Sequence, residues 1–80
     1  MTRIIEIKTT FIKLDSFLKF AGAVGDGSDA KRLIAEGLVS VDGEVCLMRG
    51  KKLYNGTVVE ITSGRGSVSY AVSAPAEAAE

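Results

Sequence analysis

Glycine turns divide the C-terminal half of this chain into short apolar segments, and this spacing limits its fold more than any other feature. Asp42-Gly43 and Asn55-Gly56 are two-residue signals for tight turns, and a third turn is expected at 63–66, in the letters SGRG. The segments between the turns alternate apolar and polar residues, which is typical of strands with one buried face. The C-terminal half is therefore predicted to be mostly strand, with a hairpin at the first turn.

The N-terminal half changes from a period of two to a helical period. A short strand is predicted at 3–8, where isoleucines alternate with charged residues. From Leu14 to Ala21 the apolar residues then recur at i, i+3, i+4 and i+7, which gathers them on one face of a helix. Gly22 is placed to end this helix, because glycine adopts the left-handed conformation that helix C-termini often need.

A second helix is predicted to begin near Ser28 and to end at Gly37. Either Asp26 or Ser28 can accept hydrogen bonds from its first free amide groups. In the hairpin that follows, Val39 and Val41 are expected to point into the core. The predicted fold is α+β, with two short N-terminal helices packed on a small antiparallel sheet.

Length and composition limit the function classes. Eighty residues make one domain, expected at 1–73 and followed by a flexible tail at 74–80 that has one proline and two acids. One cysteine and no histidine exclude an internal disulfide and favour neither a metal site nor a cofactor site. The short apolar runs and the N-terminus predict no membrane span and no signal peptide. We expect a cytoplasmic monomer.

Two weak motifs are better explained by structure than by chemistry. The stretch 25–30 fits a dinucleotide-binding fingerprint, but a helix precedes it and a chain of this length cannot hold the required parallel fold. Cys46 lies between Val45 and Leu47, so it is interpreted as a packing residue and not as a nucleophile. With no histidine to act as a base, no catalytic residue is predicted, and the protein is not expected to be an enzyme.

A local positive charge is hidden by the formal net charge of zero. Arg49, Lys51 and Lys52 lie in a stretch, 45–59, that has no Asp or Glu, and the predicted second helix adds Lys31 and Arg32. A helix and a loop that carry such cations can bind one phosphate backbone together. The alternative is a set of solvated surface side chains. The phenylalanines mostly follow the core pattern, so no base-stacking platform is expected.

Three ordered stretches resemble the S4 RNA-binding domain over residues 11–61. They are K-L-D-x-F-L-K from 13, S-D-A-K-R-L-I-A-E-G-L-V-S-V-D-G-E-V from 28 and R-G-K-K-L-x-x-G-T-V-V-E-I from 49. The chain is most similar to the small stand-alone bacterial members of the YaaA and YbcJ type. The positions that match their common pattern are Ala30, Lys31, Ile34, Gly37, Val39, Val41, Asp42 and Gly43.

The resemblance implies an L-shaped arrangement of two helices and a strand hairpin, the αL motif, that binds structured RNA without catalysis. Ribosomal RNA, transfer RNA or a ribosomal subunit is the implied partner, and Asp15 resembles the acid of the family's first helix. The family's RNA contacts carry over onto Lys13, Lys31, Arg32, Arg49, Lys51 and Lys52.

One departure from the family favours a different function. Relatives often have Glu-Thr-Arg before the segment 49–52, which we call the basic loop. This chain has Cys46, Leu47 and Met48 there, so one cation is missing. An exposed apolar patch is typical of a protein interface. The alternative function is a protein-interaction module of the same fold that uses Leu47 and Met48, and the net charge of zero also favours it.

Overall fold

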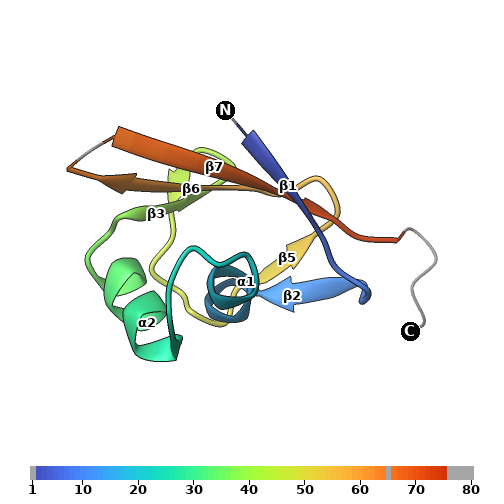
Figure 1. The fold of residues 1–80 in the computed structure, drawn as a ribbon, viewed down its shortest axis with the longest axis horizontal. Helices are drawn as coiled ribbons and strands as arrows, with labels where there is room; N and C mark the ends of the chain where they lie inside the picture. The colour runs from blue at the N-terminus through green and yellow to red at the C-terminus, as the bar shows by residue number, and fades with distance from the viewer. Residues whose placement is uncertain (1, 65, 76–80) are drawn as a thin grey trace.

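Two helices cover one face of a twisted β-sheet, and a shorter pair of strands lies beside the first helix (Figure 1). A computed structural model describes residues 2–64 and 66–75. The helices are α1 (Leu14–Phe20) and α2 (Gly27–Ala35). The strands are β1 (Thr2–Glu6), β2 (Phe11–Lys13), β3 (Val39–Val41), β4 (Glu44–Val45), β5 (Lys52–Tyr54), β6 (Val58–Ser63) and β7 (Gly66–Ser73).

The main sheet has the order β1-β7-β6-β3-β4 and is mixed. Its last four strands pair antiparallel, but β1 runs parallel to β7, from Thr2 opposite Ser69 to Glu6 opposite Ser73. The pairing continues past β1, where the N–H of Ile7 donates to the Ser73 carbonyl at 2.9 Å. The predicted α+β class with two helices is confirmed. The prediction of a purely antiparallel sheet is wrong, because the first strand joins the edge formed by the last one.

The hairpin at Asp42-Gly43 is confirmed. Asp42 has a φ of 51° and Gly43 a φ of 90°, and positive values at both central residues are what a tight two-residue hairpin turn needs. The Asp42 carboxylate also accepts a hydrogen bond from the Val58 N–H at 2.9 Å, which ties the turn to β6. Val39 and Val41 are buried as predicted.

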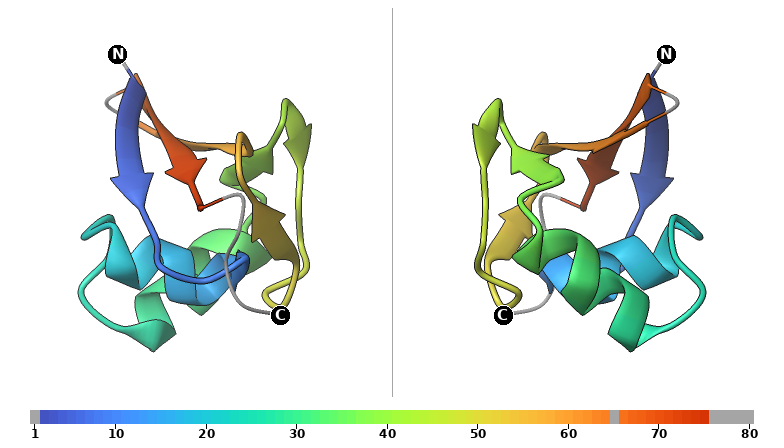
Figure 2. Two further views of the ribbon diagram at one scale, coloured as in Figure 1. Left: turned by 90° about the vertical axis from the view of Figure 1, so that its right-hand side faces the viewer. Right: turned by 90° about the vertical axis from the view of Figure 1, so that its left-hand side faces the viewer.

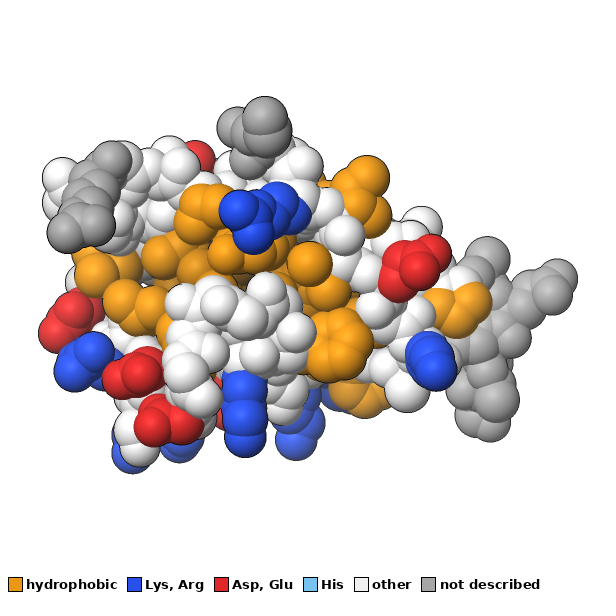
Figure 3. Space-filling model, in the orientation of Figure 1, with side chains coloured by type: hydrophobic (Ala, Val, Ile, Leu, Met, Phe, Trp, Pro, Cys, Tyr) orange, Lys and Arg blue, Asp and Glu red, His pale blue; other side chains and the backbone are white. Residues whose placement is uncertain are grey.

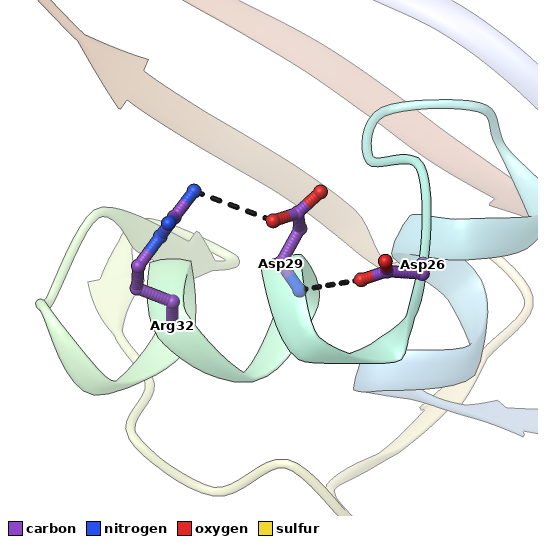
Figure 4. Close-up of polar contacts among 3 residues, drawn as sticks. All are labelled: Asp26, Asp29 and Arg32. Atoms are coloured by element: carbon purple, nitrogen blue, oxygen red, sulfur yellow. Dashed lines mark hydrogen bonds and ion pairs between the residues drawn. The ribbon is translucent and has the colours of Figure 1, made fainter.

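Both helices begin and end close to the predicted residues. Helix α1 ends at Phe20, and Gly22 has a φ of 78°. Asp26 is the N-cap of α2, because its carboxylate accepts a hydrogen bond from the Asp29 N–H at 3.0 Å (Figure 4). Of the two predicted capping residues, the aspartate therefore caps the helix. Gly37, with a φ of 75°, follows its C-terminus.

Both helices lie on one side of the main sheet in Figure 2. The core includes buried side chains from the helices, the main sheet and β5. Phe17 of α1 meets Tyr70 of β7 edge to face, with ring centroids 6.3 Å apart and planes at 87°. This contact joins the helical layer to β7, an inner strand of the sheet. The largest fully buried side chains are Phe17, Leu14, Leu18, Ile34, Leu53, Val39 and Val59.

The chain remains part of the core as far as Ala74. That residue is buried, and its N–H donates to the Asn55 side-chain carbonyl at 2.9 Å. The remainder of the expected tail, at 76–80, lies outside the described residues. Within 2–64 and 66–75, neither helix has the length and apolar character that crossing a membrane requires. The same ranges contain no group of three or more potential metal ligands.

Candidate nucleic-acid interface

The segment 46–51 leaves the sheet after β4, runs down to the helical layer and ends beside the start of α1 (Figure 2). Two backbone hydrogen bonds hold it there. The Leu14 N–H donates to the Lys51 carbonyl at 2.9 Å, and the Asp15 N–H donates to the Arg49 carbonyl at 3.1 Å. Amide groups in the first turn of a helix have no partner within the helix, so the loop satisfies two of them. The basic loop is therefore fixed against α1 by its backbone, which leaves its side chains exposed.

Strands β2 and β5 form a two-stranded antiparallel ribbon that continues from this loop, and we call it the β2–β5 ribbon. Ile12 pairs with Leu53, and both turn inwards, since Leu53 is fully buried and Ile12 packs on the core. Lys52, expected in the loop, is the first residue of β5. The side chains of one strand alternate between faces, so the other two register pairs share the outer face: Phe11 with Tyr54 and Lys13 with Lys52.

Four of the six predicted contact residues are thus brought together, and we call them the basic cluster: Lys13, Arg49, Lys51 and Lys52. All four are exposed. Lys13 is the N-cap residue of α1, yet its side chain makes no capping hydrogen bond. No ion pair involves any of the four within the part of the chain that is described. The cluster therefore combines a fixed backbone with unpaired positive charges.

Lys31 and Arg32 lie apart from the basic cluster, on α2, which packs against α1. Lys31 is exposed, and the Arg32 guanidinium forms an ion pair with Asp29 at 3.3 Å (Figure 4). The Arg32 side chain is 67% exposed, so this pair contributes less than about 1 kcal/mol and a phosphate can replace the carboxylate. Lys and Arg side chains gather along the helical edge of the molecule, with acids among them at one end (Figure 3).

Sequence reasoning missed the aromatic side chains of the ribbon. The ring centroids of Phe11 and Tyr54 lie 6.0 Å apart, and the Lys52 Nζ lies 4.8 Å from the Phe11 centroid. Phe17 follows the expected core pattern, but Phe20 is 60% exposed and Phe11 lies on the outer face of a strand. The sequence did contain a signal for these outward-facing rings. In Phe-Ile-Lys at 11–13 and Lys-Leu-Tyr at 52–54, an aliphatic residue stands between an aromatic residue and a lysine, so the aromatic residue and the lysine would share one face of a strand.

A second exposed surface is apolar. Val45, Leu47 and Met48 are 60%, 63% and 66% exposed, and they line a hollow of about 190 Å³ that also reaches Lys51. Cys46 alone turns inwards, with its Sγ 3.7 Å from the Met48 carbonyl oxygen. The burial of Cys46 confirms its interpretation as a packing residue. We call the exposed residues 47 and 48 the Leu47/Met48 surface.

Comparison with known proteins identifies the family of this chain. The S4 domain family matches residues 5–69, which includes both helices, the basic loop and the ribbon. The chain is also 45% identical over 67 residues to the probable ribosome maturation protein RlbA of Bacillus subtilis strain 168. That alignment covers 84% of this chain and 93% of the relative. This chain belongs to the S4 domain family.

Proposed function

We propose that the protein is a non-catalytic RNA-binding module that recognises structured RNA in the cytoplasm, as part of ribosome maturation or function. The observation that carries the proposal is the basic cluster, whose loop is held at the start of α1 by two backbone hydrogen bonds. A relative that covers most of the chain is named as a probable ribosome maturation protein. Ribosomal RNA is therefore the preferred ligand, and transfer RNA is the alternative.

The proposed contacts divide between two elements. Lys13, Arg49, Lys51 and Lys52 form the basic cluster beside α1, and Lys31 with Arg32 extends the surface along α2. Lysine acts on phosphate as a point charge, whereas arginine can also form paired hydrogen bonds. Such contacts position a protein on a nucleic-acid backbone without reading base sequence directly. The module is proposed to recognise RNA shape more than RNA sequence.

The experiment measures RNA affinity by electrophoretic shift or fluorescence anisotropy, with total ribosomal RNA and with a defined stem-loop. The test variant combines Lys51→Glu with Lys52→Glu, and the matched control combines Arg3→Glu with Lys8→Glu. Both variants change the net charge by the same amount, and all four residues are exposed. The proposal expects at least a tenfold loss for the test variant and a much smaller loss for the control. Equal affinities in the parent and the test variant would overturn it.

The Leu47/Met48 surface supports a second candidate function, a protein-interaction module. Its side chains are among the most exposed large apolar groups in the described residues, and exposed apolar patches often mark protein interfaces. The variant with Leu47→Ser and Met48→Ser separates the two functions. RNA binding that survives this change, together with loss of a protein partner, would favour the second candidate. Loss of RNA binding in the charge-reversed variant, with no protein partner lost in the Leu47→Ser and Met48→Ser variant, favours the first.

A further inference from the structure

The outer face of the β2–β5 ribbon carries two aromatic rings beside two lysines. Phe11 is opposite Tyr54 and Lys13 is opposite Lys52, so the rings lie towards one end of the ribbon and the cations towards the other. Residues two apart on a strand are separated by about 7 Å. The rings and the cations are therefore within reach of a single nucleotide and its neighbouring phosphate.

Local contacts hold this arrangement in place. The Lys52 ammonium lies over the Phe11 ring at 4.8 Å, a distance at which the ring attracts a cation. The Tyr54 N–H donates to the Thr57 hydroxyl at 3.2 Å, which fixes the end of β5. On the inner face, Leu53 is fully buried and anchors the ribbon to the core. Tyr54 remains 49% exposed, so part of its side chain is open to a ligand.

The chemistry of this face matches an unpaired nucleotide. Aromatic rings stack on any base, because every base has a π-face, and lysines attract the phosphates on either side. No acid lies on the ribbon, and its two lysines have no ion pair within the described part of the chain. The face is also continuous with the basic loop, since Lys52 follows Lys51 directly.

We propose that the outer face of the β2–β5 ribbon is a stacking subsite for one unpaired nucleotide of the bound RNA. The base stacks on Tyr54, with Phe11 supporting that ring, and the adjacent phosphates contact Lys13 and Lys52. This inference rests on the proposed RNA-binding function and adds to it a preference for RNA with an unpaired nucleotide. The preferred ligand is a stem with a bulged or flipped-out nucleotide beside the backbone that the basic loop contacts.

The test uses three RNA stem-loops that differ at one position: a bulged 2-aminopurine, an abasic bulge and a fully paired stem. The abasic bulge keeps the backbone flexibility but has no base to stack. The parent protein is expected to bind the 2-aminopurine bulge about tenfold more tightly than the abasic one, as one base–aromatic stack provides. Binding should also quench the 2-aminopurine fluorescence, which reports stacking without any protein variant.

Two protein variants test whether the Tyr54 ring causes the preference for the bulged base. Tyr54→Leu should reduce affinity for the bulged base to that for the abasic RNA, and it should leave binding to the paired stem unchanged. Tyr54→Phe keeps the ring and should keep both the preference and the quenching. Circular dichroism checks that both variants fold.

The outcomes separate this inference from the proposed function. Equal affinity for all three RNAs, with no quenching, would overturn the stacking subsite and leave the RNA-binding proposal intact. A uniform loss with Tyr54→Leu on all three RNAs would also overturn it, because the ring would then have only a structural role. Failure of the parent protein to bind any RNA would overturn both, and the protein-interaction function at the Leu47/Met48 surface would then be preferred.

Discussion

A single carboxylate determines where α2 begins. Asp26 accepts the hydrogen bond of the Asp29 N–H, while Ser28 is exposed and makes no capping hydrogen bond among the described residues. Replacing an N-cap aspartate with alanine removes the partner of one helix amide, so Asp26→Ala is expected to lower the free energy of unfolding by about 1 kcal/mol. Urea denaturation followed by circular dichroism measures the change.

Ser28→Ala is the matched control, because it lies in the first turn of the same helix. It is expected to change stability by less than about 0.5 kcal/mol, as surface substitutions usually do. Equal losses for the two variants would contradict the assignment of the cap. The sequence alone left both residues as candidates, since either side chain is chemically suited to the role.

Cys46 is buried in the core, so its thiol is expected to be dispensable for the proposed RNA binding. It is 9% exposed and lies between two exposed apolar neighbours. Cys46→Ala is expected to cost roughly 1 kcal/mol of stability and to leave RNA affinity unchanged, and Cys46→Ser should bind equally well. Anisotropy titration of the folded variants measures this. Complete loss of binding by a variant with a native circular dichroism spectrum would show a functional thiol.

Among the elements, the β3–β4 hairpin was predictable because its information is local. Gly43 has a φ of 90°, which a residue with a Cβ atom adopts only with strain. Gly43→Ala is therefore expected to destabilise the protein by about 1 to 2 kcal/mol. Gly50→Ala is the matched control, since Gly50 has no positive φ and an added Cβ would meet nothing within 4 Å. A loss as large at Gly50 as at Gly43 would contradict the argument.

The two helices were predictable for the same reason, whereas the β2–β5 ribbon was not. Each of its strands has three residues, which is too few to show a clear period of two. The two strands also lie far apart in the sequence, since Phe11 pairs with Tyr54. Strand β2 ends at Lys13, directly before the helical apolar pattern that starts at Leu14. No turn residue separates the two elements, so the sequence does not mark the end of the strand. Pairing between distant short strands depends on tertiary contacts that no local pattern contains.

The candidate site was predictable only in part. Arg49, Lys51 and Lys52 formed a recognisable group because they are neighbours in sequence. Lys13 joined the list through the family resemblance, and the reason for its proximity is the backbone pairing of the loop with the start of α1. Backbone hydrogen bonds of this kind cannot be predicted from the identity of the side chains, because every residue except proline has the same backbone donor and acceptor. The outward position of Tyr54 was missed because its strand was missed.

At the scale of the whole molecule, the parallel pairing of β1 with β7 closes the domain. It joins residues 2–6 to 69–73, so it brings the first and last strands of the described domain together. The strand itself was expected from its alternating isoleucines, but its partner and direction were not. The antiparallel sheet was predicted from hairpin turns between strands that follow one another in the chain. Hairpins specify only such neighbouring pairs, so they could not predict the pairing of the first strand with the last one.

The whole chain has a formal net charge of zero, so its salt dependence tests whether binding is local. Each phosphate neutralised by a cation contributes about −0.7 to −0.9 to the slope of log affinity against log salt. With four or five engaged cations, the parent protein is expected to have a slope of about −3 to −4.5. A protein that responded only to its total charge would show almost no slope.

The double variant Lys51→Glu and Lys52→Glu should reduce the steepness of that slope by about 1.5, because two phosphate contacts are lost. These lysines are the informative pair, since no acid lies between Glu44 and Glu60 to neutralise them locally. Both are exposed, so the fold should survive with a stability change of about 0.5 kcal/mol per substitution, which circular dichroism can check. The control with Arg3→Glu and Lys8→Glu should keep the parental slope. An unchanged slope in the Lys51 and Lys52 variant would mean that the basic loop is only a solvated surface, and the protein-interaction function would then be preferred.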